Sequence, residues 1–308
     1  MPAMRRLLLV SQRSLKDHAD LVRIGRRIER EAPDLRVTVV RDDRHRWLCA
    51  RLALRPTLVY SAMELKGLRP LRGAVLQGSA RTKVEEMERL ERAGLPVPRW
   101  RPVTRESAPP DVSGFGPYVV MKPESGKRGA DVRIVRSEKV RFLEPHTRVA
   151  AGTQRWIVQQ YVHTGPWPTS QRVVTLCGVP LYVTRSRADR SREPIRDATD
   201  FGKGGRSIVA SHVGCTLEFC YDADILALAE RTARAFPEIP LLGIDILRDA
   251  ESGALHVIEV NSSGQCWGFS SGLGNSMQER LGHRYESQFD AFARASRVLI
   301  EQARLLAR

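Results

Sequence analysis

Three oxygen-bearing side chains interrupt two apolar runs in the C-terminal third of the chain. Asp245 lies in the run LLGIDIL, and Glu259 and Asn261 lie in the run HVIEVN. Because side chains alternate between the two faces of a strand, Glu259 and Asn261 project from the same face. If the runs pair as an antiparallel hairpin that turns near Ser252 and Gly253, Asp245 lies opposite Glu259. The spacing therefore predicts that two carboxylates and an amide oxygen converge.

A hard divalent cation is one ligand that this group could hold. Desolvated carboxylates need counter-charge or hydrogen bonds, and Mg²⁺ prefers oxygen ligands, which it combines with water and substrate phosphates. The same pattern also fits a solvated sheet face on which the three side chains point outward by chance. The motif alone leaves both interpretations open, because short motifs often match by chance.

A glycine-bearing turn in the segment YVVMKPESGKRGADV is the second candidate site. Lys122 ends a predicted strand, and the turn after it contains Gly126, Lys127, Arg128 and Gly129. Glycines let backbone N–H groups turn toward an anion, and the basic side chains add positive charge. The turn suits a loop that covers a phosphate, although an ordinary hairpin has the same pattern. It lacks the first glycine and the final Ser or Thr of the Walker A motif.

The elements that must position these residues fall into two parts. Residues 1–80 have the pattern of a small α/β domain, to which we assign no chemistry. Its predicted elements are the helix Asp17–Glu31 and the strands Arg6–Val10, Leu35–Val40, Thr57–Tyr60 and Ala74–Leu76. The later part is richer in hairpins. Its predicted elements are the helices Thr82–Ala93, Asp222–Ala235 and Tyr285–Leu306, and the strands Val97–Val103, Tyr118–Met121, Arg133–Val135, Arg155–Val162, Gln171–Leu176 and Pro180–Thr184, besides the hairpin described above.

A long basic loop is predicted between the last of these strands and the helix after it. It runs from Arg185 to Gly205 and includes Arg187, Arg196 and Lys203. Loops longer than about 12 to 15 residues without regular structure are usually functional or disordered, and this one is too basic to be a neutral spacer.

Composition limits the classes of function. The chain has 308 residues, a formal charge of +15 and five cysteines, which lack C-x-x-C spacing. Arginines are spread along the chain and are not interleaved with aromatic residues, so nucleic acid is a less favoured partner than an anionic small molecule or peptide. The apolar run near the N-terminus is too short for a signal peptide, and no stretch reaches the length of a membrane span. A reduced, cytoplasmic protein with no membrane partner is expected.

Several runs occur in an order that resembles the ATP-grasp superfamily, closest to its glutamate-ligase-like and glutathione-synthetase-like branch. The resemblance covers roughly residues 75 to 275. Each run is common, whereas all of them in this order form a specific signal. The residues that carry it are Lys83 in RTKVEEMERLERAGLPVP, Lys122 in YVVMKPESGKRGADV, the run IVQQYV, Arg172 in SQRVVTLCG, Asp245 in GIDIL, and Glu259 with Asn261 in VIEVNSSG.

The resemblance implies an α+β ATP-grasp fold, in which two α+β subdomains hold ATP between them. A small α/β N-terminal domain precedes them. The expected ranges are 1–80 for the N-terminal domain, 81–162 for the central subdomain with the phosphate-covering loop, and 163–308 for the C-terminal subdomain with the metal site.

The resemblance also implies a set of binding residues. By similarity, Lys83 and Lys122 would contact the α- and β-phosphates of ATP, and the loop Glu124–Asp131 would fold over them. The remaining implied residues are Glu124, Ser125, Gly126 and Gly129 in that loop; Gln159, Gln160, Tyr161 and Val162 at the adenine edge; Asp245, Glu259 and Asn261 as ligands of two Mg²⁺ or Mn²⁺ ions; and Arg172, with Arg185 and Arg187 beside it, at the transferred phosphate.

The reaction implied by the resemblance is ATP-dependent formation of an amide or peptide-like bond. A substrate carboxylate attacks the γ-phosphate of ATP, and an amine, or a thiol, then converts the acyl phosphate with release of phosphate. This chemistry depends on positioning and charge neutralisation rather than on an enzyme nucleophile. Two alternatives stay open, an ATP-grasp phosphotransferase (kinase) with the same site and a non-enzymatic ATP-binding module. The sequence also leaves open the two substrates, small molecules or peptides, and the oligomeric state, with a homodimer or higher oligomer compatible.

The segment after Asn261 departs from the family pattern. It reads SSGQCWG where relatives often have a run containing proline, so Cys266 and Trp267 form an unfamiliar wall. Cys266 is a candidate nucleophile, but a buried thiol is expected because no His or Asp pairs with it at a recognisable spacing. An acid that would bind ribose is not evident in the run HTGPWPTS. His163 and His212 are candidate bases, although lone histidines are more often structural.

Overall fold

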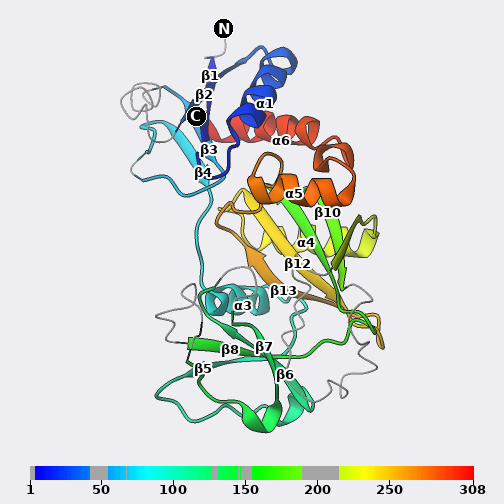
Figure 1. Ribbon diagram of the computed structural model, residues 1–308. Coiled ribbons are helices and arrows are strands. Elements are labelled where there is room, and N and C mark those ends of the chain that lie inside the picture. Colours follow the sequence, from blue (N-terminus) through cyan, green and yellow to red (C-terminus); the bar gives the residue numbers. More distant parts are fainter. Residues whose placement is uncertain are drawn as a thin grey trace.

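The computed structural model describes residues 4–41, 55–66, 68–126, 131–144, 146, 155–188 and 215–308. Within these ranges the chain forms three β-sheets, and its two ends lie at the same end of the molecule (Figure 1). None of the helices in these ranges is long and apolar enough to cross a membrane.

The N-terminal sheet has parallel strands in the order β2-β1-β3-β4. Leu7 and Leu9 of the inner strand β1 face the larger core, whereas Leu8 and Val10 belong to a smaller cluster. Strands of parallel sheets are commonly buried on both faces, which explains the unbroken apolar run. The strands match the prediction to within one residue at each end: β1 (Arg5–Ser11), β2 (Leu35–Arg41), β3 (Thr57–Ser61) and β4 (Gly73–Gln77), with the helix α1 (His18–Glu31).

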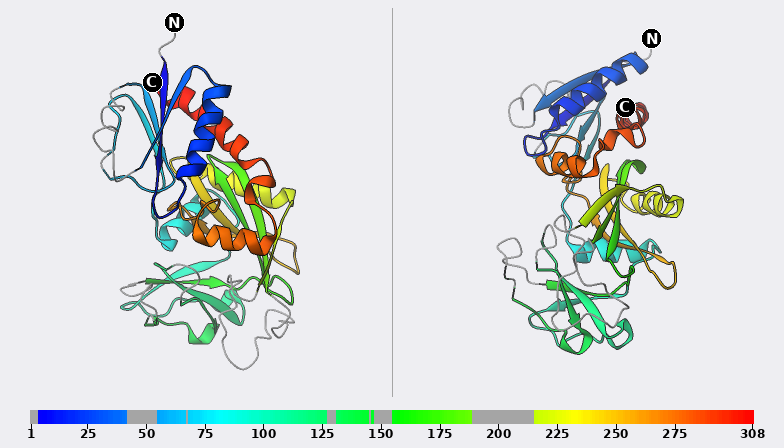
Figure 2. Two further views of the ribbon diagram at one scale, coloured as in Figure 1. Left: turned by 45° about the horizontal axis from the view of Figure 1, so that its top comes forward. Right: turned by 45° about the vertical axis from the view of Figure 1, so that its right-hand side comes forward.

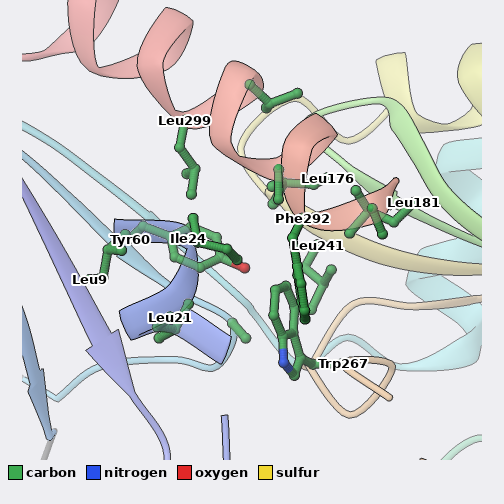
Figure 3. Packing of buried hydrophobic residues seen from close by; sticks show 14 of the residues in the cluster. Leu9, Leu21, Ile24, Tyr60, Leu176, Leu181, Leu241, Trp267, Phe292 and Leu299 are labelled. Atoms are coloured by element: carbon green, nitrogen blue, oxygen red, sulfur yellow. The ribbon is translucent and has the colours of Figure 1, made fainter. Parts of the chain in front are cut away.

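The last helix, α6 (Ala291–Leu306), returns to this sheet and packs against α1 (Figures 1 and 2). Phe292 and Leu299 share one buried cluster with Leu21 and Ile24 of α1, and Trp267 belongs to the same cluster (Figure 3). The helix begins later than predicted, because the chain first forms a short 3-10 turn, η3 (Tyr285–Ser287). The end of the chain therefore completes the core of its beginning.

The central part consists of the helix α3 (Lys83–Arg92) and an antiparallel sheet in the order β5-β8-β6-β7. Thr82 caps α3: its hydroxyl accepts from the Glu85 N–H, while the Glu85 carboxylate accepts from the Thr82 N–H. This reciprocal pair fixes the start of the helix and so the position of Lys83. The strands are β5 (Trp100–Thr104), which begins later than predicted, β6 (Tyr118–Pro123), β7 (Arg133–Arg136) and β8 (Arg155–Gln160), with the 3-10 turns η1 (Ser113–Phe115) and η2 (Ser137–Lys139).

The C-terminal sheet is antiparallel in the order β11-β10-β9-β12-β13. The helix α4 packs against β9, β10 and β12, and the helix α5 packs against β11. The elements are β9 (Thr169–Leu176), β10 (Val179–Ala188), β11 (Cys215–Phe219), α4 (Ala223–Arg234), β12 (Leu241–Arg248), β13 (Leu255–Asn261) and α5 (Gly272–Leu281).

The β12–β13 hairpin has the predicted register. Asp245 lies opposite Glu259, and Gly243 lies opposite Asn261. The next partner of β12 is Val257 rather than Ile258, so β13 contains one extra residue at this point, a β-bulge that the sequence did not predict. Gly253 closes the turn with a φ of +73°, a conformation that glycine adopts without strain.

The later half differs from the prediction in three places. Residues 185–188 belong to β10 rather than to a loop, because they pair with both β9 and β11. Strand β11 and helix α5 were not predicted; the sequence suggested a glycine- and serine-rich turn over residues 262–274, and α5 begins within it at Gly272. Ser271 caps α5 by accepting from the Gly274 N–H, which gives the helix a defined start despite its glycines. The rest of the predicted loop, through Gly205, lies outside the described residues.

Candidate functional site

A cleft of about 750 Å³ lies between the central sheet and the C-terminal sheet. Strands β6 and β8 line one side, the C-terminal sheet lines the other, and the start of α3 closes one flank. Most of the binding residues implied by the resemblance line this cleft. Those described are Lys83, Lys122, Glu124, Ser125, Gly126, Gln159, Gln160, Tyr161, Val162, Arg172, Asp245, Glu259 and Asn261.

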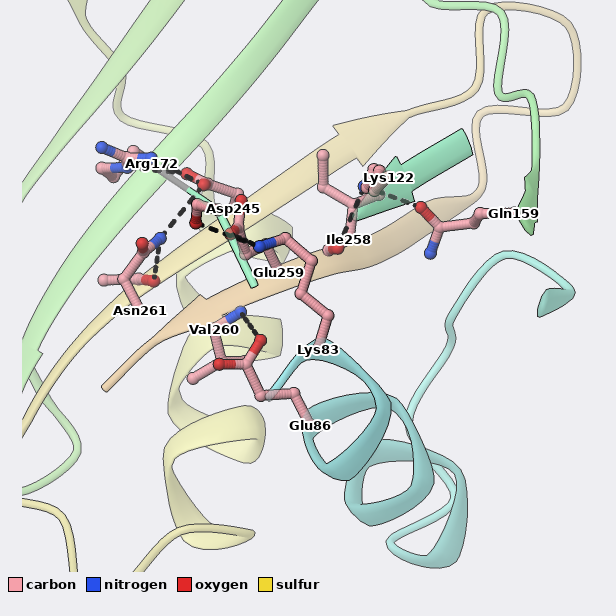
Figure 4. Close-up of polar contacts among 12 residues, drawn as sticks. Lys83, Glu86, Lys122, Gln159, Arg172, Asp245, Ile258, Glu259, Val260 and Asn261 are labelled. Atoms are coloured by element: carbon pink, nitrogen blue, oxygen red, sulfur yellow. Dashed lines mark hydrogen bonds and ion pairs between the residues drawn. The ribbon is translucent and has the colours of Figure 1, made fainter. Parts of the chain in front are cut away.

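The three predicted metal ligands are neighbours in the cleft (Figure 4). The Asn261 amide nitrogen donates to Asp245 Oδ2 over 3.3 Å and to the Gly243 carbonyl over 3.3 Å, which leaves the amide oxygen for another ligand. Glu259 Oε1 lies 3.3 Å from Lys83 Nζ. Two carboxylates and one amide oxygen are suitable donors for Mg²⁺. In the described part of the chain no cluster of three His, Cys, Asp or Glu side chains could hold a metal, so a cation here would need Asn261 or a phosphate as a further ligand.

Opposite charges hold the carboxylates in place. Arg172 donates from Nε to Asp245 Oδ1 and from Nη2 to Asp245 Oδ2, each over 2.7 Å, in a two-point contact with fixed geometry. Burial alone would raise the pKa of the Glu259 carboxyl, but nearby cations, foremost Lys83, hold that pKa below its usual range. Glu259 is therefore favoured in its ionised form, the form that a metal ligand needs.

Two lysines reach the region next to these carboxylates from different elements. Lys122 of β6 is buried, and its Nζ donates to Gln159 Oε1 over 2.8 Å and to the Ile258 carbonyl over 3.4 Å. Burial lowers the pKa of the Lys122 ammonium. Lys83 Nζ donates to the Gly126 carbonyl over 3.4 Å. The lysines thus surround the point where a phosphate would meet the carboxylates.

The described start of the phosphate-covering loop is fixed to its surroundings. The Lys83 N–H donates to the Glu124 carbonyl over 3.3 Å, and the Glu124 carboxylate forms an ion pair of 2.7 Å with Arg155. Ser125 and Gly126 line the cleft. Gly129 lies outside the described residues.

The other end of the cleft is apolar and suits a nucleobase. Val120, Ile134, Leu247 and Ile258 line it beside the segment Gln160–Val162. Apolar walls with a few backbone polar groups are typical of nucleobase and other small-molecule sites.

Gln159 does not extend to this end as the resemblance implied. Its side chain is 2% exposed, accepts from Lys122 and donates to Met87 Sδ over 3.6 Å. Strand pairing explains the difference, because Gln159 lies opposite Val120 in the middle of the sheet and next to the strand that carries Lys122. Gln159 is placed to position the lysine rather than to meet the adenine edge.

Arg172 is the one arginine of the predicted set of three that the structure brings to the cleft. Arg185 and Arg187 lie on β10 and pair with Glu218 of β11 over 3.1 and 3.4 Å. Thr184 and Ser186, which alternate with them, are the β10 residues that line the cleft. Side chains alternate along a strand, so the two arginines point to the opposite face. The expectation that they act beside Arg172 is therefore wrong.

Glu86 was not predicted and lies beside the carboxylates. It follows Lys83 by one helical turn and lines the cleft, and its Oε2 accepts from the Val260 N–H over 3.5 Å (Figure 4). Burial, with the charge of Glu259 added, raises the pKa of the Glu86 carboxyl well above its usual range. Glu86 follows Lys83 by three residues, a spacing that places both side chains on one face of the helix. Glutamates are mostly exposed to solvent, however, so this spacing alone did not predict a buried carboxyl.

The segment after Asn261 packs inward. Cys266 is buried, as expected, and burial raises the pKa of its thiol to about 12. The Trp267 indole N–H donates to Asp20 Oδ2 of α1 over 3.0 Å. His163 is buried, and its backbone carbonyl accepts from the Ala250 N–H. His212 lies outside the described residues.

Comparisons with known proteins identify the fold. A family model described as an ATP-grasp domain matches residues 80–264. The chain belongs to the ATP-grasp family. The match spans the cleft and every element that lines it except α5. No curated protein sequence matches this ATP-grasp chain significantly.

Solved structures share the ATP-grasp fold over nearly the whole chain. The D-cycloserine synthetase DcsG is 15% identical with a TM-score of 0.54, covering 96% of this chain and 99% of its own. The ATP-grasp ligase PsnB, in complex with a minimal precursor, Mg and ADP, is 16% identical with a TM-score of 0.54, covering 97% and 98%. PsnB with the precursor peptide PsnA2 and AMPPNP is 16% identical with a TM-score of 0.54, and the match covers 98% of this chain and 98% of PsnB. At these identities the likeness concerns the fold.

Proposed function

We propose that this protein is an ATP-dependent ligase that joins a carboxylate to an amine, or to a thiol, through an acyl phosphate. The observation that carries the proposal is the convergence of Asp245, Glu259, Asn261, Lys83, Lys122 and Arg172 in one cleft. Phosphoryl transfer needs positioning and charge neutralisation, which this set can provide. The shared fold of a D-cycloserine synthetase and of a ligase that binds a peptide precursor supports the same class.

The cleft has a direction that fits ATP. The apolar end by Val120, Ile134 and Leu247 suits adenine, and the backbone of Tyr161 and Val162 can supply the hydrogen bonds of its edge. Lys122 and Lys83 then lie where the phosphates would be. The nucleotide would point its γ-phosphate toward the C-terminal sheet.

Magnesium, or manganese, would be held by Asp245, Glu259 and Asn261, with two ions expected from the family. When bound, such ions neutralise phosphate charge that develops during transfer. Arg172 would orient Asp245 through its two-point contact, and Lys83 would pair with Glu259.

Arg172 is the residue best placed to contact the transferred phosphoryl group. Its Nε and Nη2 bind Asp245, while its Nη1 makes no hydrogen bond to any described residue. A donor that is fixed in advance and aimed at developing charge lowers the barrier without further reorganisation. The substrate carboxylate would therefore react next to Arg172, on the side away from adenine.

Two variants of the hairpin test the proposal. Glu259→Gln and Asn261→Ala should each abolish ATP-dependent product formation while circular dichroism shows an intact fold. Glu251→Gln, an exposed change in the turn of the same hairpin, is the matched control and should behave as the wild type. Near-normal turnover of either hairpin variant would overturn the metal assignment.

The products separate ligase from kinase. With a pool of carboxylates and amines, ligation gives ADP, free phosphate and an amide. A stable phosphorylated acceptor without phosphate release would instead establish the phosphotransferase alternative.

A further inference from the structure

The cleft also extends across the C-terminal sheet, from Arg172 of β9 toward β10, β11 and α5. This extension, the substrate end, is lined by Ser170, Thr184, Ser186, Leu217, Leu273 and Met277 and by the loop from Ser262 to Gln265. The resemblance assigned none of these residues. The chemistry of this end bears on the carboxylate substrate, so the inference below rests on the proposed function.

The floor of the substrate end is polar but uncharged. Strand register places Thr184 opposite Arg172 and Ser186 opposite Ser170. Paired residues two positions apart share a face of the sheet, so the three hydroxyl side chains lie on the same face as Arg172. A substrate carboxylate at Arg172 would lie over hydroxyl groups that can donate to it.

The far wall of the substrate end is apolar. Leu273 and Met277 lie one turn apart on the same face of α5, which packs against the strand that carries Leu217. Leu273 is 43% exposed. A single exposed leucine is common on protein surfaces, but three apolar side chains that line one cleft form a surface suited to an apolar ligand.

The described residues named for this end are uncharged. Two arginines of the same cleft lie next to them: Arg172 on the neighbouring strand, and Arg81, two residues after Ser79, which bonds to Ser262. Arg280 of α5 lies near the wall, but it donates to the Cys215 carbonyl and is not part of the lining. Among the described residues, Leu217, Leu273 and Met277 offer no charged partner, so a charged group brought against them would lose hydration without compensation. The net charge of +15 of the whole chain therefore does not indicate that the substrate is charged where it contacts the substrate end.

We propose that the carboxylate substrate has an uncharged, apolar body. Its carboxylate would lie at Arg172, and its body would cross the hydroxyl floor to contact Leu217, Leu273 and Met277. An acidic or basic group at the far end of the substrate would be rejected.

Three carboxylates of matched length test the proposal: hexanoate, adipate and 6-aminohexanoate. In each case a carboxylate oxygen attacks the γ-phosphorus of ATP, and the bond to ADP breaks. Hydroxylamine then attacks the acyl carbon, phosphate leaves, and the nitrogen loses a proton to give a hydroxamate. Because hydroxylamine replaces the natural amine, the assay reports on the carboxylate alone.

Hexanoate should give a kcat/KM for hydroxamate formation at least about tenfold above those of adipate and 6-aminohexanoate, since a buried apolar chain is favoured and a buried charge is penalised. Leu273→Arg should shift the preference toward adipate by about tenfold and leave the KM for ATP unchanged. Leu305→Arg, at an exposed leucine of α6, is the matched control and should leave the preference unchanged.

The possible failures are distinguishable. Equal turnover of the three compounds, a preference for either charged one, or turnover of a broad carboxylate pool that excludes all three would overturn the inference. It would also be overturned if Leu273→Arg, folded by circular dichroism, kept the wild-type preference. Absence of hydroxamate from every carboxylate would instead overturn the proposed ligase function.

Discussion

Two regions of the cleft, the phosphate end that includes Arg172 and the substrate end over β10, β11 and α5, hold their side chains in different ways. At the phosphate end, charged groups are fixed by specific partners: Arg172 by Asp245, Lys83 by Glu259, and Lys122 by the Gln159 amide. At the substrate end, hydroxyls and apolar side chains surround the space and no ion pair lies among them. This holds for the residues that the structure describes.

Under the proposed function, this difference would separate the part that performs the chemistry from the part that selects the carboxylate substrate. Partners within a charged, half-buried network couple strongly, so a change to one member disturbs the others. Apolar and hydroxyl side chains that line an open space share fewer partners, so a substitution of one should disturb the others less. Substitutions at the phosphate end should therefore abolish activity, whereas those at the substrate end should change which carboxylate is used.

The largest effect is expected at the boundary between the two ends. Arg172→Met removes the counter-charge of Asp245 and a donor to the transferred phosphoryl group, so kcat should fall by about 10²–10³. ADP release at saturating ATP measures this. Arg187→Met, on the opposite face of the same sheet, is the matched control. Equal losses in both variants would show that the cleft-facing position of Arg172 does not matter.

A smaller effect is expected inside the phosphate end. Gln159→Leu removes a hydrogen bond to the buried Lys122 ammonium, a contact worth about 1.5–3 kcal/mol, so the Kd for ATP should rise roughly 10- to 100-fold. Calorimetric titration with ATP provides the measurement. Gln159→Glu keeps an acceptor at the same place and should restore most of the affinity. Wild-type affinity in the leucine variant would mean that Lys122 is held by other groups.

A still smaller effect is expected at the substrate end. Ser186→Ala removes one hydroxyl of the floor, and a neutral hydrogen bond contributes about 0.5–1.5 kcal/mol. The KM for the carboxylate should rise a few-fold while the KM for ATP stays the same. Ser107→Ala, at an exposed site outside the cleft, should change neither constant. A rise in the KM for ATP would remove the distinction between the two ends.

The smallest effect concerns the segment behind the substrate end. Asp20 accepts from the Trp267 indole N–H and from Ser270, and burial raises the pKa of its carboxyl. Because the pKa of Asp20 is raised in the folded state, its protonated carboxyl contributes stability at low pH. That contribution is lost as pH rises through the folded pKa. Asp20→Asn should remove that dependence, so relative to the wild type the variant should gain up to about 1 kcal/mol between pH 3 and pH 7. Urea unfolding of both proteins at the two pH values measures it, and parallel curves would contradict the assignment.

The sequence was sufficient to predict the metal-type hairpin because polar residues are rare in buried strands. Three of them at strand spacing determined both the face and the register, and Asp245 does lie opposite Glu259. The bulge at Ile258 could not be predicted, since it depends on how β13 fits its neighbours. Gln159 shows the same limit: its partner Lys122 follows from the pairing of β6 with β8.

The substrate end could not be predicted because it is built from segments without a clear pattern. Strand β11 has only five residues, and its pairing with β10 is what turns Arg185 and Arg187 away from the cleft. Helix α5 begins with two glycines in three residues, a composition typical of a turn. Leu217, Leu273 and Met277 also resemble ordinary core residues in sequence, and only their positions around one space indicate a different role.

The return of α6 to the N-terminal sheet has a consequence for how the protein is made. Domains commonly fold in the order in which they leave the ribosome. Here the surface of α1 that carries Leu21 and Ile24 stays uncovered until Phe292 and Leu299 have been synthesised. The first sheet to emerge is therefore the last to acquire its full core, and during translation its exposed apolar face is a natural binding site for a chaperone.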